Sequence, residues 1–167
     1  MRVRVLGIDP GYAIVGFGVV EYHAGRFQTL DYGALTTVAH TPMNDRLLEI
    51  YQGMQTLLST YRPDAIAVEE LFFNTNRTTA VYVCQARGVI MLAAKQANVP
   101  VFEYTPSQVK QAVVGYGKAE KKQVQLLTQS LLRLKTLPRP DDAADALAIA
   151  ICHAHSAGSA HLFEKGV

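Results

Sequence analysis

The sequence predicts an α/β domain built on a five-stranded mixed sheet with helices packed against it. Two observations predict it. Three strand-like runs come first, and from residue 64 onward strand-like runs alternate with longer segments of helical spacing. Of the 167 residues, 49% are hydrophobic, which is enough for one full core. We expect a single domain over residues 1–155 and a flexible tail over 156–167.

The first three runs predict an antiparallel meander. Each is strand-like, and Asp9-Pro10-Gly11 and the sequence "HAGR" supply the turns between them. The three expected strands are "RVRVLGID" (2–9), "IVGFGVVEY" (14–22) and "FQTLDYGALTT" (27–37). The meander leaves one edge of its first strand free for further, parallel strands.

The rest of the chain alternates between short strands and helices. A helix is expected to begin near Thr41-Pro42, with Thr41 as its cap, because apolar residues then recur at helical spacing. Glycines and prolines separate the last three helical segments. After the first helix we expect strands over 64–71 and 99–105 and helices over 78–97, 106–114, 119–134 and 141–155.

Charge is unevenly distributed along the chain. Residues 71–139 contain ten Lys or Arg and two acids, whereas the net charge of the whole chain is only +2. A basic stretch beside acidic positions suits a polyanion bound next to a metal, although charge alone favours a solvated basic helix face. With two cysteines, no signal-peptide pattern and no apolar run long enough to span a membrane, we expect a soluble cytoplasmic protein.

Four carboxylates are expected to converge. Asp9 ends the first strand and Glu69 ends the fourth, so the two project from one rim if these strands are neighbours. Asp142 and Asp145 share one face at the start of the last helix, where surrounding alanines let a helix lie close to a sheet. Asp141, directly after Pro140, is explained as a helix cap.

Such a group of acids requires compensation, because mutual repulsion raises the pKa values of neighbouring carboxyl groups. Mg²⁺ prefers carboxylate and water oxygens, and two such ions can activate a water and stabilise the leaving oxygen of a phosphodiester. We therefore predict a site for two Mg²⁺ ions, with Mn²⁺ as a substitute, held by Asp9, Glu69, Asp142 and Asp145.

Taken together and in order, several motifs resemble one family. Over residues 3–155 the chain is similar to the RuvC Holliday-junction resolvases. The motifs that carry the resemblance are "GIDPG", "VEELFF", "QARGV", "VPVFEYTPSQVKQAVVGYGKAEKKQVQ" and "DDAADALAIAICHAH". It implies a ribonuclease-H-like fold, a homodimer and paired, symmetric, metal-dependent nicking of four-way DNA junctions that leaves 5′-phosphate and 3′-hydroxyl ends. It also implies a branch-migration helicase partner.

The resemblance assigns further site residues. The four acids fall on the family's catalytic positions, and Glu70 stands where the family often has a neutral residue. Lys110 and Lys121 fall near the scissile phosphate, with Lys121 as a catalytic residue. The remaining expected DNA contacts are Phe72, Phe73, Asn74, Arg77, Lys118 and Lys122. From position alone the two phenylalanines could equally be core residues; the resemblance favours DNA contact for one of them, most closely Phe72.

Three other functions remain as alternatives. "GIDPG" is also a phosphate-loop pattern of actin-like ATPases, but these need a second domain that this chain does not show. A non-catalytic DNA-binding relative would have lost one or more of the acids, and all four are present. A nuclease acting on RNA–DNA hybrids has a similar acid set, although the lysine-rich "AEKKQVQ" fits the junction enzymes better.

Overall fold

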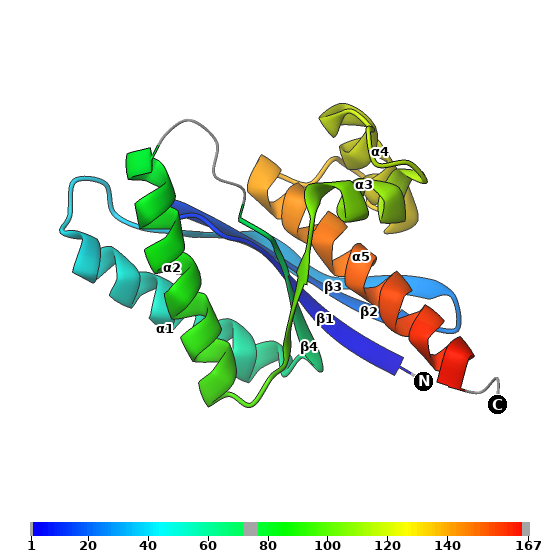
Figure 1. Cartoon of the computed structure of the whole chain (residues 1–167), viewed down its shortest axis with the longest axis horizontal. Helices are drawn as coiled ribbons and strands as arrows, with labels where there is room; N and C mark the ends of the chain where they lie inside the picture. The colour runs from blue at the N-terminus through cyan, green and yellow to red at the C-terminus, as the bar shows by residue number, and fades with distance from the viewer. Residues whose placement is uncertain (1, 72–76, 165–167) are drawn as a thin grey trace.

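The computed structural model describes residues 2–71 and 77–164, the side chains of 77, 78 and 158–164 excepted. Five strands and five helices follow one another in the described chain (Figure 1). The strands are β1 (Arg2–Asp9), β2 (Ile14–His23), β3 (Arg26–Thr36), β4 (Ala65–Glu69) and β5 (Val101–Tyr104). The helices are α1 (Met43–Tyr61), α2 (Arg77–Gln96), α3 (Pro106–Val114), α4 (Lys121–Leu131) and α5 (Asp141–Glu164).

The strands form one mixed sheet in the order β3-β2-β1-β4-β5. The β1–β2 and β2–β3 pairs are antiparallel, and β1–β4 and β4–β5 are parallel. The predicted meander with parallel additions is therefore confirmed. β1 lies in the centre, between the meander and the parallel strands.

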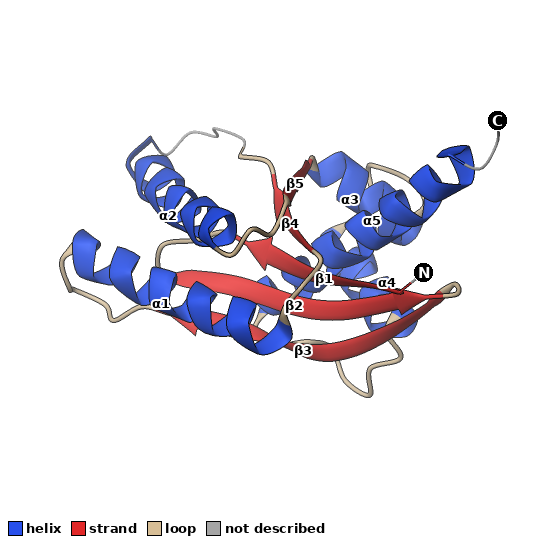
Figure 2. Ribbon diagram, turned by 90° about the horizontal axis from the view of Figure 1, so that it is seen from below, coloured by secondary structure: helices blue, strands red, loops and turns tan. Residues whose placement is uncertain are grey.

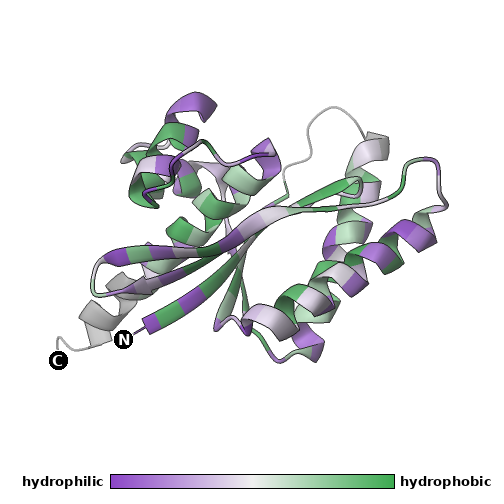
Figure 3. Ribbon diagram, turned by 180° about the vertical axis from the view of Figure 1, so that it is seen from behind, coloured by the Kyte–Doolittle hydropathy of each residue, from purple (hydrophilic) through white to green (hydrophobic). Residues whose placement is uncertain are grey.

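Helices cover both faces of the sheet (Figure 2). One hydrophobic cluster joins α1 and α2 to alternate sheet positions such as Ile8 and Val68. A second cluster joins α3, α4 and α5 to the intervening positions, such as Val5 and Ala67. Successive strand residues point to opposite faces, so a strand buried on both sides reads as a nearly continuous apolar run. In Figure 3, α5 is mostly green where it crosses the sheet, whereas α1 alternates between green and purple.

Three helix ends differ from the expected ones. α5 continues to Glu164, so the boundary expected at His155 was placed too early. α4 is shorter than expected, because it begins after Glu120 and ends at Leu131. Thr41 is not the cap of α1, since its hydroxyl donates to the Val38 carbonyl at 2.7 Å and Pro42 precedes the helix. No helix in the described ranges has both the length and the apolar character needed to cross a bilayer.

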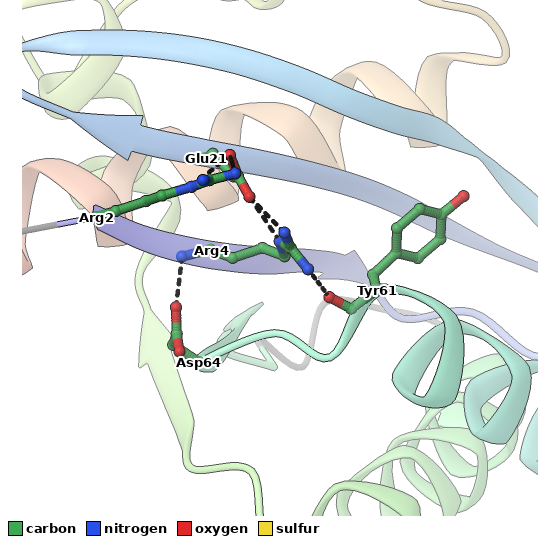
Figure 4. Close-up of polar contacts among 5 residues, drawn as sticks. All are labelled: Arg2, Arg4, Glu21, Tyr61 and Asp64. Carbon is green, nitrogen blue, oxygen red and sulfur yellow. Dashed lines mark hydrogen bonds and ion pairs between the residues drawn. The ribbon is translucent and has the colours of Figure 1, made fainter.

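A network of charged side chains lies at the end of the sheet where β1 begins (Figure 4). Glu21 of β2 is 4% exposed, and its carboxylate accepts hydrogen bonds from the guanidinium groups of Arg2 and Arg4. Arg4 also donates to the Tyr61 carbonyl at the end of α1, and its backbone N–H donates to Asp64 at 2.7 Å. The network thus joins β1, β2 and the chain that leads from α1 into β4.

We expect Glu21→Gln to lower the free energy of unfolding by about 1–3 kcal/mol, because it leaves two guanidinium groups without their carboxylate. Burial alone would raise the pKa of Glu21, but the hydrogen bonds from Arg4 and Arg2 outweigh it and lower the pKa below 4.5. The stabilisation is therefore present above pH 4.5 and lost as the pH falls through the folded-state pKa. Urea unfolding of both proteins across this range measures it, and a difference that stayed constant with pH would contradict the assignment.

Candidate functional site

Asp9 and Glu69 end neighbouring parallel strands at the same edge of the sheet. β1 and β4 pair from Val5–Ala65 to Ile8–Val68, and each acid is the next residue along its strand. By alternation, both side chains lie on the face that α5 covers, the face of Val5 and Ala67. The predicted adjacency of these strands is confirmed.

Glycines in β1 and β2 allow α5 to approach this edge closely. Gly16 pairs opposite Asp9, and a Cβ atom on Gly16 would lie 2.1 Å from the Asp142 carbonyl oxygen. A Cβ atom on Gly7 would lie 2.0 Å from the Ala146 carbonyl oxygen. From the sequence, the alanines of the last helix predict this close packing. The glycines at positions 7, 16 and 18 carried the same signal, because a glycine inside a strand often marks a close backbone approach.

The four carboxyl groups lie within electrostatic reach of one another. Burial and, after it, the charges of Asp145, Asp142 and Glu69 together raise the pKa of Asp9 to about 7, against the opposing charge of Lys121. Burial also raises the pKa of Glu69, with Asp145 adding to it. Burial raises the pKa of Asp145 despite the opposing effect of Lys121. The fold therefore gathers the acids that the sequence predicted to converge.

Two of the expected lysines lie at this acidic site. Lys121, the first residue of α4, forms an ion pair with Asp145, with its Nζ 3.0 Å from Oδ2. This contact raises the pKa of Lys121. The charge of Lys110 on α3 opposes the rise in the pKa of Glu69. Lys118 and Lys122 are exposed.

The donor chemistry of the site fits a hard divalent cation. Carboxylate oxygens are the ligands that Mg²⁺ and Mn²⁺ prefer. The raised pKa of Asp9, about 7, indicates that the negative charges at this site are not fully compensated by neighbouring positive charge. Among the described residues, no three His, Cys, Asp or Glu side chains are already arranged around a common metal position. The residues therefore fit such an ion in kind, with Lys121 partly compensating the acids.

Other predicted site residues have different surroundings. Phe72, Phe73 and Asn74 lie outside the described residues, as does the side chain of Arg77, the first residue of α2. Asp141 lies in the first turn of α5 rather than before it, and its carboxylate pairs with Arg139.

His153 and His155 of α5 contact different residues. His153 Nδ1 lies 2.7 Å from the Tyr104 hydroxyl, whereas the ring of His155 packs against Tyr22 and Phe27. Both cysteines are free thiols; Cys152 is buried, and Cys84 is partly buried.

Comparisons with known proteins identify the family of this chain. The sequence profile of the family described as crossover junction endodeoxyribonuclease RuvC matches residues 5–153. The crossover junction endodeoxyribonuclease RuvC of Brevibacillus brevis is 62% identical over 152 residues, which are 91% of this chain and 92% of that protein. The protein of the same description from Syntrophomonas wolfei is 58% identical over 154 residues, 92% of this chain and 90% of that protein.

Solved structures show the same fold. Thermus thermophilus RuvC in complex with a Holliday junction substrate superposes with a TM-score of 0.90 at 41% identity, covering 95% of this chain and 96% of that one. The yeast mitochondrial Holliday junction resolvase Ydc2, at 16% identity, covers 91% of this chain and 78% of its own with a TM-score of 0.68, which supports the fold alone. The fold is thus ribonuclease-H-like, as the resemblance implied. By profile, sequence identity and structure together, the chain belongs to the RuvC family of crossover junction endodeoxyribonucleases.

Proposed function

We propose that this chain resolves four-way DNA junctions by metal-dependent nicking during recombination and repair. The observation that carries the proposal is the convergence of Asp9, Glu69, Asp142 and Asp145 at one sheet edge, where burial and the three neighbouring acids raise the pKa of Asp9 to about 7. The relatives named as crossover junction endodeoxyribonucleases support the substrate class, as does the Thermus protein solved with a Holliday junction.

The four carboxylates would hold Mg²⁺, two ions per site, with Mn²⁺ as a substitute. Bound there, these ions supply an activated water and stabilise the leaving oxygen. The strands fix Asp9 and Glu69, and the first two turns of α5 fix Asp142 and Asp145. Attack on phosphorus with departure of the 3′-oxygen leaves 5′-phosphate and 3′-hydroxyl ends.

The lysines would act on the charge of the phosphate. Lys121, held beside Asp145, and Lys110, beside Glu69, would place ammonium groups where negative charge develops in the transition state. Lys118 and Lys122, both exposed, would contact the DNA backbone without reading bases. Phe72, or Phe73 beside it, would stack on a base at the opened junction centre, with Asn74 and Arg77 contacting the adjacent backbone.

Paired nicking requires two sites, which a two-fold dimer would supply. The outer face of α2 is the candidate interface, since Val81 and Leu92 are each 54% exposed and a Cβ atom on Gly88 would meet open space. A monomer in sedimentation velocity at micromolar concentration would contradict paired nicking. A branch-migration helicase is the further partner that we propose for such a dimer.

A synthetic four-way junction with Mg²⁺ tests the function directly. We expect the wild-type chain to nick two opposing strands and Asp9→Asn to bind the junction without nicking it. A linear duplex and an RNA–DNA hybrid of the same sequence serve as controls for junction selectivity. Undiminished nicking by Asp9→Asn would overturn the metal-ligand assignment, and preferred cleavage of the hybrid would favour a ribonuclease H activity instead.

Lys121→Ala separates catalysis from binding. We expect the single-turnover nicking rate to fall by about 10²–10³-fold, the typical cost of removing a group that stabilises transition-state charge. Junction affinity should change little, because many other basic residues contact the backbone. Lys122→Ala, the exposed neighbour on α4, is the matched control and should affect affinity more than rate. Equal losses of rate and affinity in Lys121→Ala would contradict its catalytic role.

A further inference from the structure

Arg87 is a buried cation on α2 that the proposed chemistry does not use. Arg87 is only 8% exposed. Among the described residues, Arg87 and Glu21 are the buried members of the Asp, Glu, Lys and Arg set. A buried charge is tolerated only when it is paired and hydrogen-bonded. Its two recorded partners therefore indicate what the burial achieves.

Both partners lie at the edge of the sheet that holds the acids. The Arg87 Nη1 donates to the backbone carbonyl of Glu69 at 2.9 Å, and its Nη2 lies 2.7 Å from the Glu103 carboxylate on β5. The β1–β4 ladder ends at the Ile8–Val68 pair, so Glu69 lies one residue beyond it. Arg87 thus contacts the backbone of Glu69 at the point where its pairing with β1 has ended.

The two faces of β4 separate the backbone contact from the carboxylate. Val68 packs in the α1–α2 cluster, and its β5 neighbour Glu103 reaches Arg87 on that side. The Glu69 side chain points to the opposite face, where Asp145, Lys110 and Lys121 act on its pKa. A guanidinium that restrains the Glu69 peptide from one face therefore restrains the direction of the carboxylate on the other.

We propose that Arg87, anchored by Glu103, is a positioning residue that orients Glu69 for metal binding. Arg87 lies on the buried side of α2, whereas the neighbouring Gly88 faces open space on the proposed dimer face. The position of the interface helix is thereby linked to the position of one acid. This inference rests on the proposed function, since it takes Glu69 as a metal ligand.

The test compares Arg87→Met, Arg87→Lys and Glu103→Gln with Lys95→Met, an exposed lysine in the last turn of the same helix. Mn²⁺ affinity is measured by calorimetry without DNA, single-turnover nicking with Mg²⁺, and junction affinity in EDTA. We expect Arg87→Met to lose about 10–100-fold in Mn²⁺ affinity and nicking rate, as is typical for groups that orient metal ligands. Junction affinity should hold, Arg87→Lys should recover part of the loss, and Lys95→Met should match the wild type.

Each outcome decides whether Arg87 positions Glu69 or only stabilises the fold. Wild-type Mn²⁺ affinity and nicking rate in both Arg87→Met and Arg87→Lys would overturn the proposal. Losses of Mn²⁺ affinity and nicking rate that are fully explained by a lower melting temperature would overturn it as well. If Arg87→Met does not fold, Glu103→Gln decides, since it removes the partner of Arg87 at a site that is 43% exposed. A wild-type chain that binds Mn²⁺ but never nicks would refute the proposed function. The Mn²⁺ affinities of the variants would still test whether Arg87 positions Glu69.

Discussion

Gly16→Ala is expected to reduce the single-turnover nicking rate by about 100-fold while the chain still folds, because a displacement near 1 Å at a reacting site costs about that much. The added methyl group would lie 2.1 Å from the Asp142 carbonyl oxygen, so the first turn of α5 must move away from β2. Gly16 pairs opposite Asp9, so this movement separates Asp142 from Asp9. Overpacking of this kind also lowers the free energy of unfolding, by about 1–3 kcal/mol.

Two other glycines provide the comparison. Gly33→Ala would place its methyl group 3.2 Å from the ring of Phe17 on β2, away from α5, and should leave nicking close to the wild-type rate. Gly7→Ala collides with α5 about one turn further along, at Ala146, and should cost more in stability. A Gly16→Ala protein with the nicking rate of Gly33→Ala would show that the approach of α5 does not set the geometry of the acids.

Asp9→Asn is expected to stabilise the metal-free protein above pH 7 even though it abolishes nicking. The ordinary pKa of an aspartate is 3.8, whereas that of Asp9 in the fold is about 7, so the folded chain holds this proton more tightly than the unfolded chain. The free energy of unfolding of the wild type therefore falls, through this group, as the pH rises from about 4 to about 7. Asparagine never becomes charged, so it avoids both the burial of a charge and the repulsion by the neighbouring acids.

The stabilisation follows from the size of the shift. Each unit of pKa corresponds to 1.36 kcal/mol, so the shift sets an upper limit of about 4 kcal/mol, and solvent screening of these half-buried groups reduces the expected gain to about 2 kcal/mol. For a chain of this size that gain raises the melting temperature by about 4–8 °C. Melting curves in EDTA at pH 4 and pH 8 measure it, with the exposed Asp45→Asn as the matched control. A variant less stable than the wild type at pH 8 would contradict the repulsion.

Saturating Mg²⁺ should reverse the order of the two proteins. Binding to the native state alone stabilises the wild type by mass action, whereas Asp9→Asn has lost a ligand and should gain less. Loss of nicking in Asp9→Asn would then be explained by the missing carboxylate rather than by a poorer fold.

Local sequence determined most of the elements and the identity of the acids. The short apolar run that ends in Glu69 predicted a buried strand, and the alternating run that ends in Asp9 predicted the first strand of the meander, which lies in the centre of the sheet. The helix over Pro106–Val114 begins at a Thr-Pro pair and ends at Gly115, so its bounds were predictable as well. The extension of α5 to Glu164 was not, because its last turns lack the apolar spacing that marks a packed helix.

Only the tertiary structure decided how the acids meet. The sequence by itself determined which carboxylates end β1 and β4 and which begin α5, because these depend on periodicity and turn residues within a few positions. The glycine contacts that bring α5 onto the sheet, the Lys121–Asp145 pair and the Arg87 contact with Glu69 join residues that are far apart along the chain. Local spacing carries no information about such distances, since they are set by the packing of whole elements across the sheet.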